Sequence, residues 1–95
     1  MGALWIAHVD VEDAEKYGEY IEIASVVIPE HGGEFIARGG KVVHFEGIAR
    51  ARNVVARFPS VEAAEAAYAD PRYQRAVEIA KASSTREVMV VETAD

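Results

Sequence analysis

The sequence predicts an α+β fold: one antiparallel four-stranded sheet with helices on one face. The predicted elements run strand, helix, strand, strand, helix, strand along 95 residues, a length that fits one domain, residues 1–95. The helical segments repeat apolar residues every three or four positions, and the strands are short runs rich in Val, Ile and aromatic residues. This order is the ferredoxin-like βαββαβ layout.

The first strand and helix are read from "ALWIAHVDV", residues 3–11, and the segment that follows. The strand has no Gly or Pro, and both of its faces begin apolar, as is typical of a central strand. Asp13 is the expected N-cap, and "HGG" at 31–33 ends the helix with glycine in the left-handed region. The expected inner stripe of the helix is Tyr17, Tyr20, Ile21, Ala24, Val27 and Ile28.

The segment "EFIARGGKVVHFEG", residues 34–47, has three possible structures: a hairpin, one bent strand, or a glycine loop around a ligand. No helix follows Gly39-Gly40 and no phosphate-loop pattern includes them, which argues against a nucleotide loop. A hairpin would add a strand to a layout whose connection already lies at "GIARA". We therefore predict one edge strand, bent or bulged at the glycines, whose unpaired half is covered by a second copy of the chain.

The second half of the chain contains clear start signals. "RNVVARF", residues 52–58, is a strand that ends on Phe58, which we expect in the core. Ser60 is the N-cap of the helix "VEAAEAAYA", and Asp70-Pro71 restarts a helix over "RYQRAVEIAKAS". "REVMVVE", residues 86–92, is the last strand.

Composition excludes several classes of protein. The net charge of −6 disfavours nucleic-acid binding and anionic membrane surfaces, and the absence of cysteine excludes disulfides. No apolar run approaches the ~20 residues that span a bilayer, and no signal peptide is recognisable. We expect a cytoplasmic protein. Because the strands are apolar on both faces and no segment remains to cover the second face, we also expect a homodimer that associates through its sheet faces.

The motifs "RGGKVVHFEG" and "FPSVEAAEAAYADPRYQRA" resemble the domain-of-unknown-function 1330 family, within the dimeric α/β-barrel superfamily. The resemblance extends from "WIAHVDVEDAEKYGEYI" to the last strand. It implies a ferredoxin-like protomer and a dimer whose sheets face each other, but no settled activity. The wider superfamily includes cofactor-independent monooxygenases and isomerases that act on small cyclic or aromatic substrates.

Four residues are the candidates for chemistry. His8 and His44 each lie within an apolar predicted strand, either as hydrogen-bonded structural histidines or as acid/base groups lining a cleft. Arg38 and Arg57 either form ion pairs with Glu46, Asp10 or an acid of a partner chain, or anchor a carboxylate ligand. The histidines lack metal-ligand spacing, so we expect no metal and no cofactor.

Two functions follow from these residues. One is a homodimeric binding protein or small enzyme that takes a small carboxylate or cyclic molecule in a cleft lined by the sheet. The other is a structural or regulatory dimer without turnover. A pocket with convergent polar groups would favour the first, and a filled interior the second.

Overall fold

The computed structural model describes residues 1–95 and contains four strands and three helices. In chain order they are β1 (Ala3–Val11), α1 (Ala14–Glu30), β2 (Glu34–Arg38), β3 (Arg52–Phe58), α2 (Val61–Ala69), α3 (Pro71–Ser83) and β4 (Ser84–Glu92). The predicted order of elements is confirmed, with the second helical region divided at Asp70 as the sequence indicates. None of the helices has the length and apolar character needed to cross a membrane.

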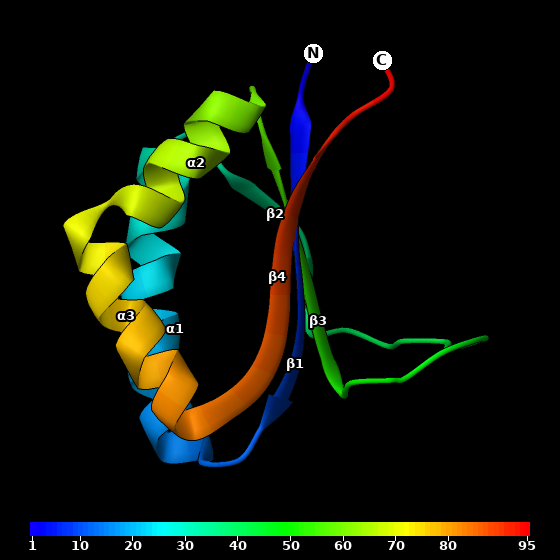
Figure 1. Ribbon diagram of the computed structural model, residues 1–95, viewed down its shortest axis with the longest axis vertical. Helices are drawn as coiled ribbons and strands as arrows, with labels where there is room; N and C mark the ends of the chain where they lie inside the picture. Colours follow the sequence, from blue (N-terminus) through cyan, green and yellow to red (C-terminus); the bar gives the residue numbers. More distant parts are fainter.

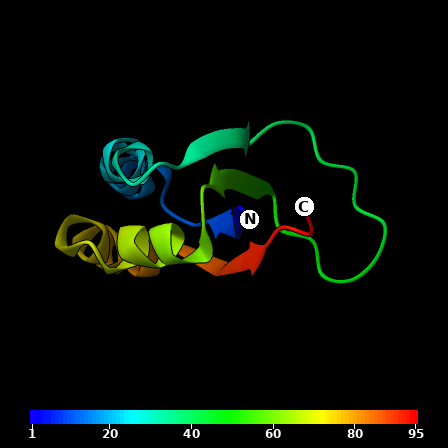
Figure 2. The same cartoon turned by 90° about the horizontal axis from the view of Figure 1, so that it is seen from above.

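The four strands form one sheet in the order β2-β3-β1-β4, with every neighbouring pair antiparallel. This is the predicted ferredoxin-like arrangement. The three helices lie together on one face of the sheet (Figure 1), and the view from above shows the same two layers (Figure 2). Central β1 pairs along its length with β3 and β4, so that Trp5 lies opposite Ala56 and Val90.

The hydrophobic core fills the space between the sheet and the helices. The odd-numbered residues of β1 from Ala3 to Val9 are buried. Trp5 lies at the centre of the core, and its ring centroid is 5.8 Å from that of Phe58 and 5.3 Å from that of Tyr73. Phe58 is 1% exposed, as predicted. The predicted stripe of α1 is buried except for Ile21, which is partly buried.

Side-chain caps explain where the helices begin. The Asp13 carboxylate accepts a hydrogen bond from the Lys16 amide at 3.1 Å, and the Ser60 hydroxyl accepts one from Ala63 at 3.0 Å. Asp70 accepts the Arg72 amide at 2.8 Å, so it caps α3. Each side chain satisfies an amide that the first helical turn leaves without a partner, which is why these starts were predictable.

The strand predicted over residues 34–47 is only partly present. β2 ends at Arg38, and Phe35 and Arg38 pair with Ala56 and Val54 of β3, so the hairpin alternative is excluded. The register shift lies between Phe35 and Ala37, not at the glycines. We call residues 39–51 the arm: they contain no strand and protrude from the sheet (Figure 1).

The prediction of a strand beyond Gly39 was therefore wrong for the protomer. β3 begins only at Arg52, so the arm has no neighbouring strand with which to form backbone hydrogen bonds. Gly39 has φ +77°, a left-handed conformation, where the chain leaves the sheet, although its amide still donates to the Asn53 carbonyl at 3.0 Å. Pairing of the arm with a second copy remains a prediction.

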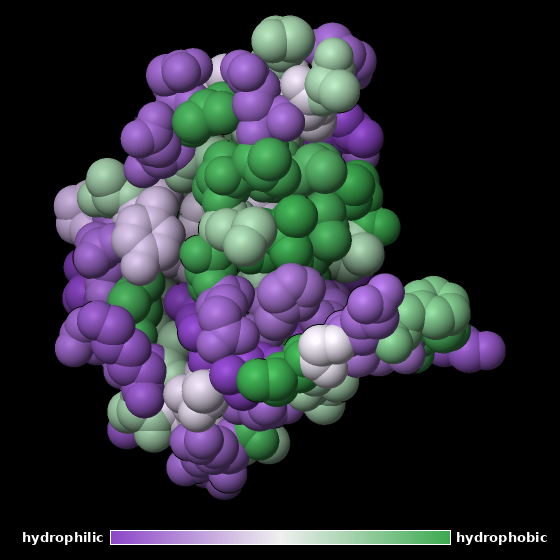
Figure 3. All heavy atoms as spheres, turned by 45° about the vertical axis from the view of Figure 1, so that its right-hand side comes forward, coloured by the Kyte–Doolittle hydropathy of each residue, from purple (hydrophilic) through white to green (hydrophobic).

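The second face of the sheet carries no helix, and we call it the open face. Even-numbered residues of β1 and their cross-strand partners point to it, and the apolar residues among them form a patch beside the arm (Figure 3). Met89 and Val91 are 53% and 46% exposed. The apolar members are Leu4, Ile6, Val55, Met89 and Val91.

Candidate functional site

A narrow cleft lies between α1 and the sheet. We call it the cleft; it spans about 360 Å³ including its mouth, and its enclosed interior is about 30 Å³. Most of the side chains that line it are apolar or aromatic, and two are arginines. The lining residues used below are Trp5, Tyr17, Tyr20, Phe35, Arg38 and Arg52. An interior of this size has room for one or two water molecules, so a ring-sized ligand enters only when a side chain at the mouth moves.

Two arginines that line this cleft, and a third that stacks on one of its tyrosines, have no carboxylate partner. The Arg38 guanidinium lies 4.1 Å from the centroid of the Phe35 ring and donates a hydrogen bond to the Ser25 hydroxyl. Arg52 lies against Gly39, where an added Cβ would approach its Nη1 to 2.6 Å. Arg86 does not line the cleft itself. It stacks on Tyr20, with Cζ 4.4 Å from the centroid of the Tyr20 ring.

The arginines are unusual because acids outnumber bases in this chain, with 16 Asp and Glu against 10 Lys and Arg. No ion pair within 4.0 Å involves any of the three. The Nη1 of Arg86 is buried and has no hydrogen-bond partner. A positively charged rim on an aromatic cleft is suited to an anionic organic ligand, because guanidinium groups bind carboxylates well and stack on rings.

A pair of hydrogen-bonded phenols leads from the cleft into the core. The Tyr20 and Tyr73 hydroxyl oxygens are 2.7 Å apart, and Nη2 of Arg86 donates to the Tyr73 oxygen at 3.4 Å. Tyr73 is fully buried. Burial raises the pKa of Tyr73 far above its ordinary value and also raises that of Tyr17, so both phenols are protonated at neutral pH.

A second polar cluster holds the base of the arm at the open face. Arg50 forms a two-pronged contact with Glu87, at 2.6 Å and 2.9 Å, and donates to Asp10 at 2.8 Å. The Ala51 amide also donates to Asp10, at 3.0 Å. This backbone bond and then Arg50 lower the pKa of Asp10, and Arg50 lowers the pKa of Glu87. The arm is thus tied to β1 and β4.

His8 and His44 meet at an open hollow beside this cluster. His8 Nδ1 and Asn53 Oδ1 are 2.5 Å apart, and the Asn53 amide nitrogen donates to the Arg50 carbonyl at 3.0 Å. Because that second bond orients the amide, His8 Nδ1 donates to its oxygen. The Nε2 atom of neutral His8 then carries a free lone pair. His44 is exposed and contacts the Gly47 carbonyl through Nε2 at 3.2 Å.

The structure therefore separates the four predicted site residues. His8 and His44 share the hollow, although His44 lies on the arm and not in the strand expected for it. Arg38 lies on the helix side, in the cleft. Arg57 is exposed, faces Leu4 and Glu34 across the sheet, and lines none of the four hollows of the surface. Within the protomer, neither Arg38 nor Arg57 forms an ion pair, and Asp10, one of the suggested partners, is held by Arg50. An ion pair with an acid of a second copy remains a prediction.

Arg52, Arg86 and the phenols were not predicted as site residues. A signal for Arg86 exists in "REVMVVE", where it shares its strand face with Val88 and Val90, both partly buried against the core. Arg52 likewise shares a face with Val54 and Ala56. A charged residue on the core face of a strand needs a polar partner. That argument would have drawn attention to both arginines.

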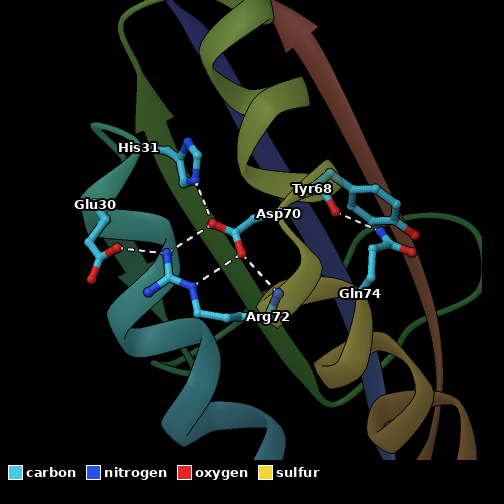
Figure 4. Close-up of polar contacts among 6 residues, drawn as sticks. All are labelled: Glu30, His31, Tyr68, Asp70, Arg72 and Gln74. Carbon is cyan, nitrogen blue, oxygen red and sulfur yellow. Dashed lines mark hydrogen bonds and ion pairs between the residues drawn. The ribbon is translucent and has the colours of Figure 1, made fainter.

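His31 belongs to a separate contact between helices (Figure 4). It caps α1, as expected, and its Nε2 lies 3.0 Å from Asp70 Oδ2. Arg72 binds both Asp70, at 2.9 Å, and Glu30, at 2.7 Å. Hydrogen bonds from Arg72 and then from His31 hold the pKa of Asp70 well below its usual range. This cluster joins the end of α1 to the junction of α2 and α3.

Comparison with known proteins identifies the family. Residues 2–94 match the sequence model "Domain of unknown function (DUF1330)", so the chain belongs to the DUF1330 family, as its motifs indicated. No curated protein sequence matches this chain.

Similar solved structures support the fold. RPA0582, a protein of unknown function from Rhodopseudomonas palustris, is 19% identical, with a TM-score of 0.81 over 99% of this chain and 83% of its own. A dimeric ferredoxin-like protein of unknown function from Jannaschia sp. CCS1 is 18% identical, with a TM-score of 0.79 over 98% of this chain and 100% of its own. The cofactor-independent oxygenase SnoaB from Streptomyces nogalater is 13% identical, with a TM-score of 0.70 over 99% of this chain and 94% of its own. At these identities the likeness concerns the fold.

Proposed function

We propose that the protein binds a small anionic organic molecule, with an aromatic or other cyclic body, in the cleft between α1 and the sheet. The observation that carries this proposal is that Arg38 and Arg52, which line the cleft, and Arg86, which stacks on Tyr20, all lack a carboxylate partner in a protein with excess acid. Aromatic walls supply contact area for a ring, and the arginines supply charge for its anionic group. A cofactor-independent oxygenase among the structural neighbours is consistent with turnover of such a molecule.

Arg38 is the group that opens the cleft. Its side chain is exposed and is held over Phe35 by a stacking contact and by the hydroxyl of Ser25. An anionic ligand offers Arg38 a stronger, charge-assisted hydrogen bond than the neutral Ser25 hydroxyl. When Arg38 leaves Ser25 and binds the ligand, its side chain moves and the mouth of the cleft widens.

Benzoate, an aromatic carboxylate, is a suitable probe for this site. Trp5 is the only tryptophan and lines the cleft, so its fluorescence reports binding. We expect the double variant Arg38→Gln/Arg52→Gln to bind benzoate about 10-fold more weakly or worse. Arg75→Gln is the control, because Arg75 is exposed on α3 and lies outside the cleft. Equal affinity of the wild type and the double variant would overturn the proposal.

We also propose that the open face is covered by a second copy of the chain. The patch of exposed apolar residues and the description of several structural neighbours as dimeric support this assembly. In such a dimer the arm and the hollow at His8 and His44 lie at the interface, where His8 Nε2 is a candidate acid/base group. Light scattering at micromolar concentration should give about twice the chain mass; a monomer would refute the assembly.

A non-catalytic structural or regulatory dimer is the second candidate function. It is favoured by the ion-paired base of the arm, where Arg50, Asp10 and Glu87 satisfy one another and leave no free charge for a substrate. Failure of benzoate and related anions to bind, in a protein that is dimeric, would favour this second function.

A further inference from the structure

The hydroxyl groups of Tyr20 and Tyr73 have a defined direction of hydrogen bonding. Their oxygens are 2.7 Å apart, and either could donate when the pair is considered alone. Arg86 removes this ambiguity, because a guanidinium only donates, and its Nη2 lies 3.4 Å from the Tyr73 oxygen. The Tyr73 oxygen therefore faces a donor on that side and cannot direct its own proton there.

Tyr73 must donate to Tyr20. Tyr73 is fully buried, and the one acceptor within hydrogen-bond distance of its hydroxyl is the Tyr20 oxygen. If Tyr20 donated instead, the Tyr73 proton would be buried without an acceptor, which costs about 1–3 kcal/mol. Burial also raises the pKa of Tyr73, so the proton is retained at neutral pH. The order of donors is thus Arg86, Tyr73, Tyr20.

The proton of Tyr20 is then left without a partner inside the protein. Tyr20 is only 7% exposed, and no acceptor other than the Tyr73 oxygen lies within hydrogen-bond distance of its hydroxyl; Arg86, which also lies beside it, can only donate. Of the four hollows of the surface, the cleft is the only one that Tyr20 lines. The buried Nη1 of Arg86 is a second donor without an acceptor in the same cluster. Both features call for acceptor atoms from a bound molecule or from water.

We propose that Tyr20 donates a hydrogen bond to an anionic oxygen of the cleft ligand, which makes it a specificity-determining residue. The ligand class is a small ring compound bound as a carboxylate, enolate or phenolate. Tyr73 and Arg86 are positioning residues, since they orient the Tyr20 hydroxyl and polarise it through a chain of hydrogen bonds. This inference rests on the proposed function of the cleft, and it adds which atom of the ligand is recognised and by which residue.

Discrimination follows from the same geometry. A ligand that lacks an acceptor oxygen displaces water from the cleft and leaves the Tyr20 proton buried and unpaired. Sites built to hydrogen-bond a polar group reject analogues without it more strongly than apolar pockets reject small differences in size. An anionic acceptor gains more than a neutral one because hydrogen bonds to charged groups are about twice as strong.

The test compares 4-nitrophenolate with nitrobenzene, two rings of similar shape of which only the first carries an anionic oxygen. Binding is followed by quenching of Trp5 fluorescence at a pH above the pKa of free 4-nitrophenol. We expect the wild type to prefer 4-nitrophenolate, and Tyr20→Phe to weaken its binding about 10- to 100-fold while leaving nitrobenzene binding unchanged. Tyr73→Phe should reduce the same preference by a smaller factor, which a purely structural role would not do.

Tyr68→Phe is the matched control. Tyr68 belongs to the same aromatic cluster and contacts the Trp5 ring at 5.9 Å, but it is 41% exposed and does not line the cleft. Failure of both probes to bind would overturn the proposed function and this inference with it. If both bind but Tyr20→Phe keeps the preference, only the inference is overturned. Should Tyr20→Phe not fold, equal affinity of the wild type for the two probes would overturn the inference by itself.

Discussion

Arginine side chains on the two faces of the sheet differ in whether their charge is compensated. On the open face, Arg50 is held by Glu87 and Asp10 at 2.6–2.8 Å, and its charge is compensated. On the helix-covered face, Arg86 contacts only phenols, and one of its nitrogens is buried without a partner. Burial makes charge costly, so an uncompensated guanidinium is least expected where it is found.

This difference distinguishes a structural cluster from a candidate site. The acids around Arg50 are exposed, with side-chain exposures of 43% for Asp10 and 57% for Glu87, so each pair contributes little to stability. Their effect is local, since they tie the arm to β1 and β4. Arg38, Arg52 and Arg86 form no ion pair within the protomer, and the proposed anionic ligand would supply a partner for their charge.

The largest expected effect is a difference in unfolding free energy between a substitution in the core and one on the open face. Phe58→Ala removes a ring that is 1% exposed and should lower the free energy of unfolding by ~3–5 kcal/mol at any protein concentration. Met89→Ala, on the open face, should change it by under ~1 kcal/mol in dilute protein, because Met89 is 53% exposed. Urea unfolding monitored by circular dichroism measures both.

Protein concentration sharpens this contrast. If a second copy covers the open face, Met89→Ala should become more destabilising as concentration rises, since association stabilises the folded state by mass action. A change under ~1 kcal/mol for Phe58→Ala would show that the ring does not hold the two layers together. A concentration-independent Met89→Ala would count against the proposed dimer face.

A smaller effect distinguishes the two glycines that open the arm. Gly39 has φ +77°, and an added side chain there would meet Arg52, whereas Gly40 has open space around it. Gly39→Val should therefore cost ~1–2 kcal/mol for the left-handed backbone and should also weaken benzoate binding by displacing Arg52. Gly40→Val is the control, expected within about 0.5 kcal/mol of wild type in urea unfolding. Equal effects of the two changes would show that Arg52 does not depend on Gly39.

The sequence by itself determined the elements of this fold and their order. The sequence signals for these elements are local. The caps Asp13, Ser60 and Asp70 accept hydrogen bonds from amides within three residues, and the apolar repeat of α1 lies within the helix itself. All three helix starts and the burial of Phe58 were predictable for that reason. The family also followed from contiguous motifs, confirmed by a match over residues 2–94.

Only the tertiary structure decided which polar residues meet. Arg52 and Arg86 come from different strands, and both lie beside Val9 because of the register of β3 and β4 against β1. That register depends on pairings between distant parts of the chain, which no local pattern encodes. The same reason explains the arm: "KVVHF" has the composition of a strand, but a strand needs a neighbour, and in the protomer β3 begins too late to provide one.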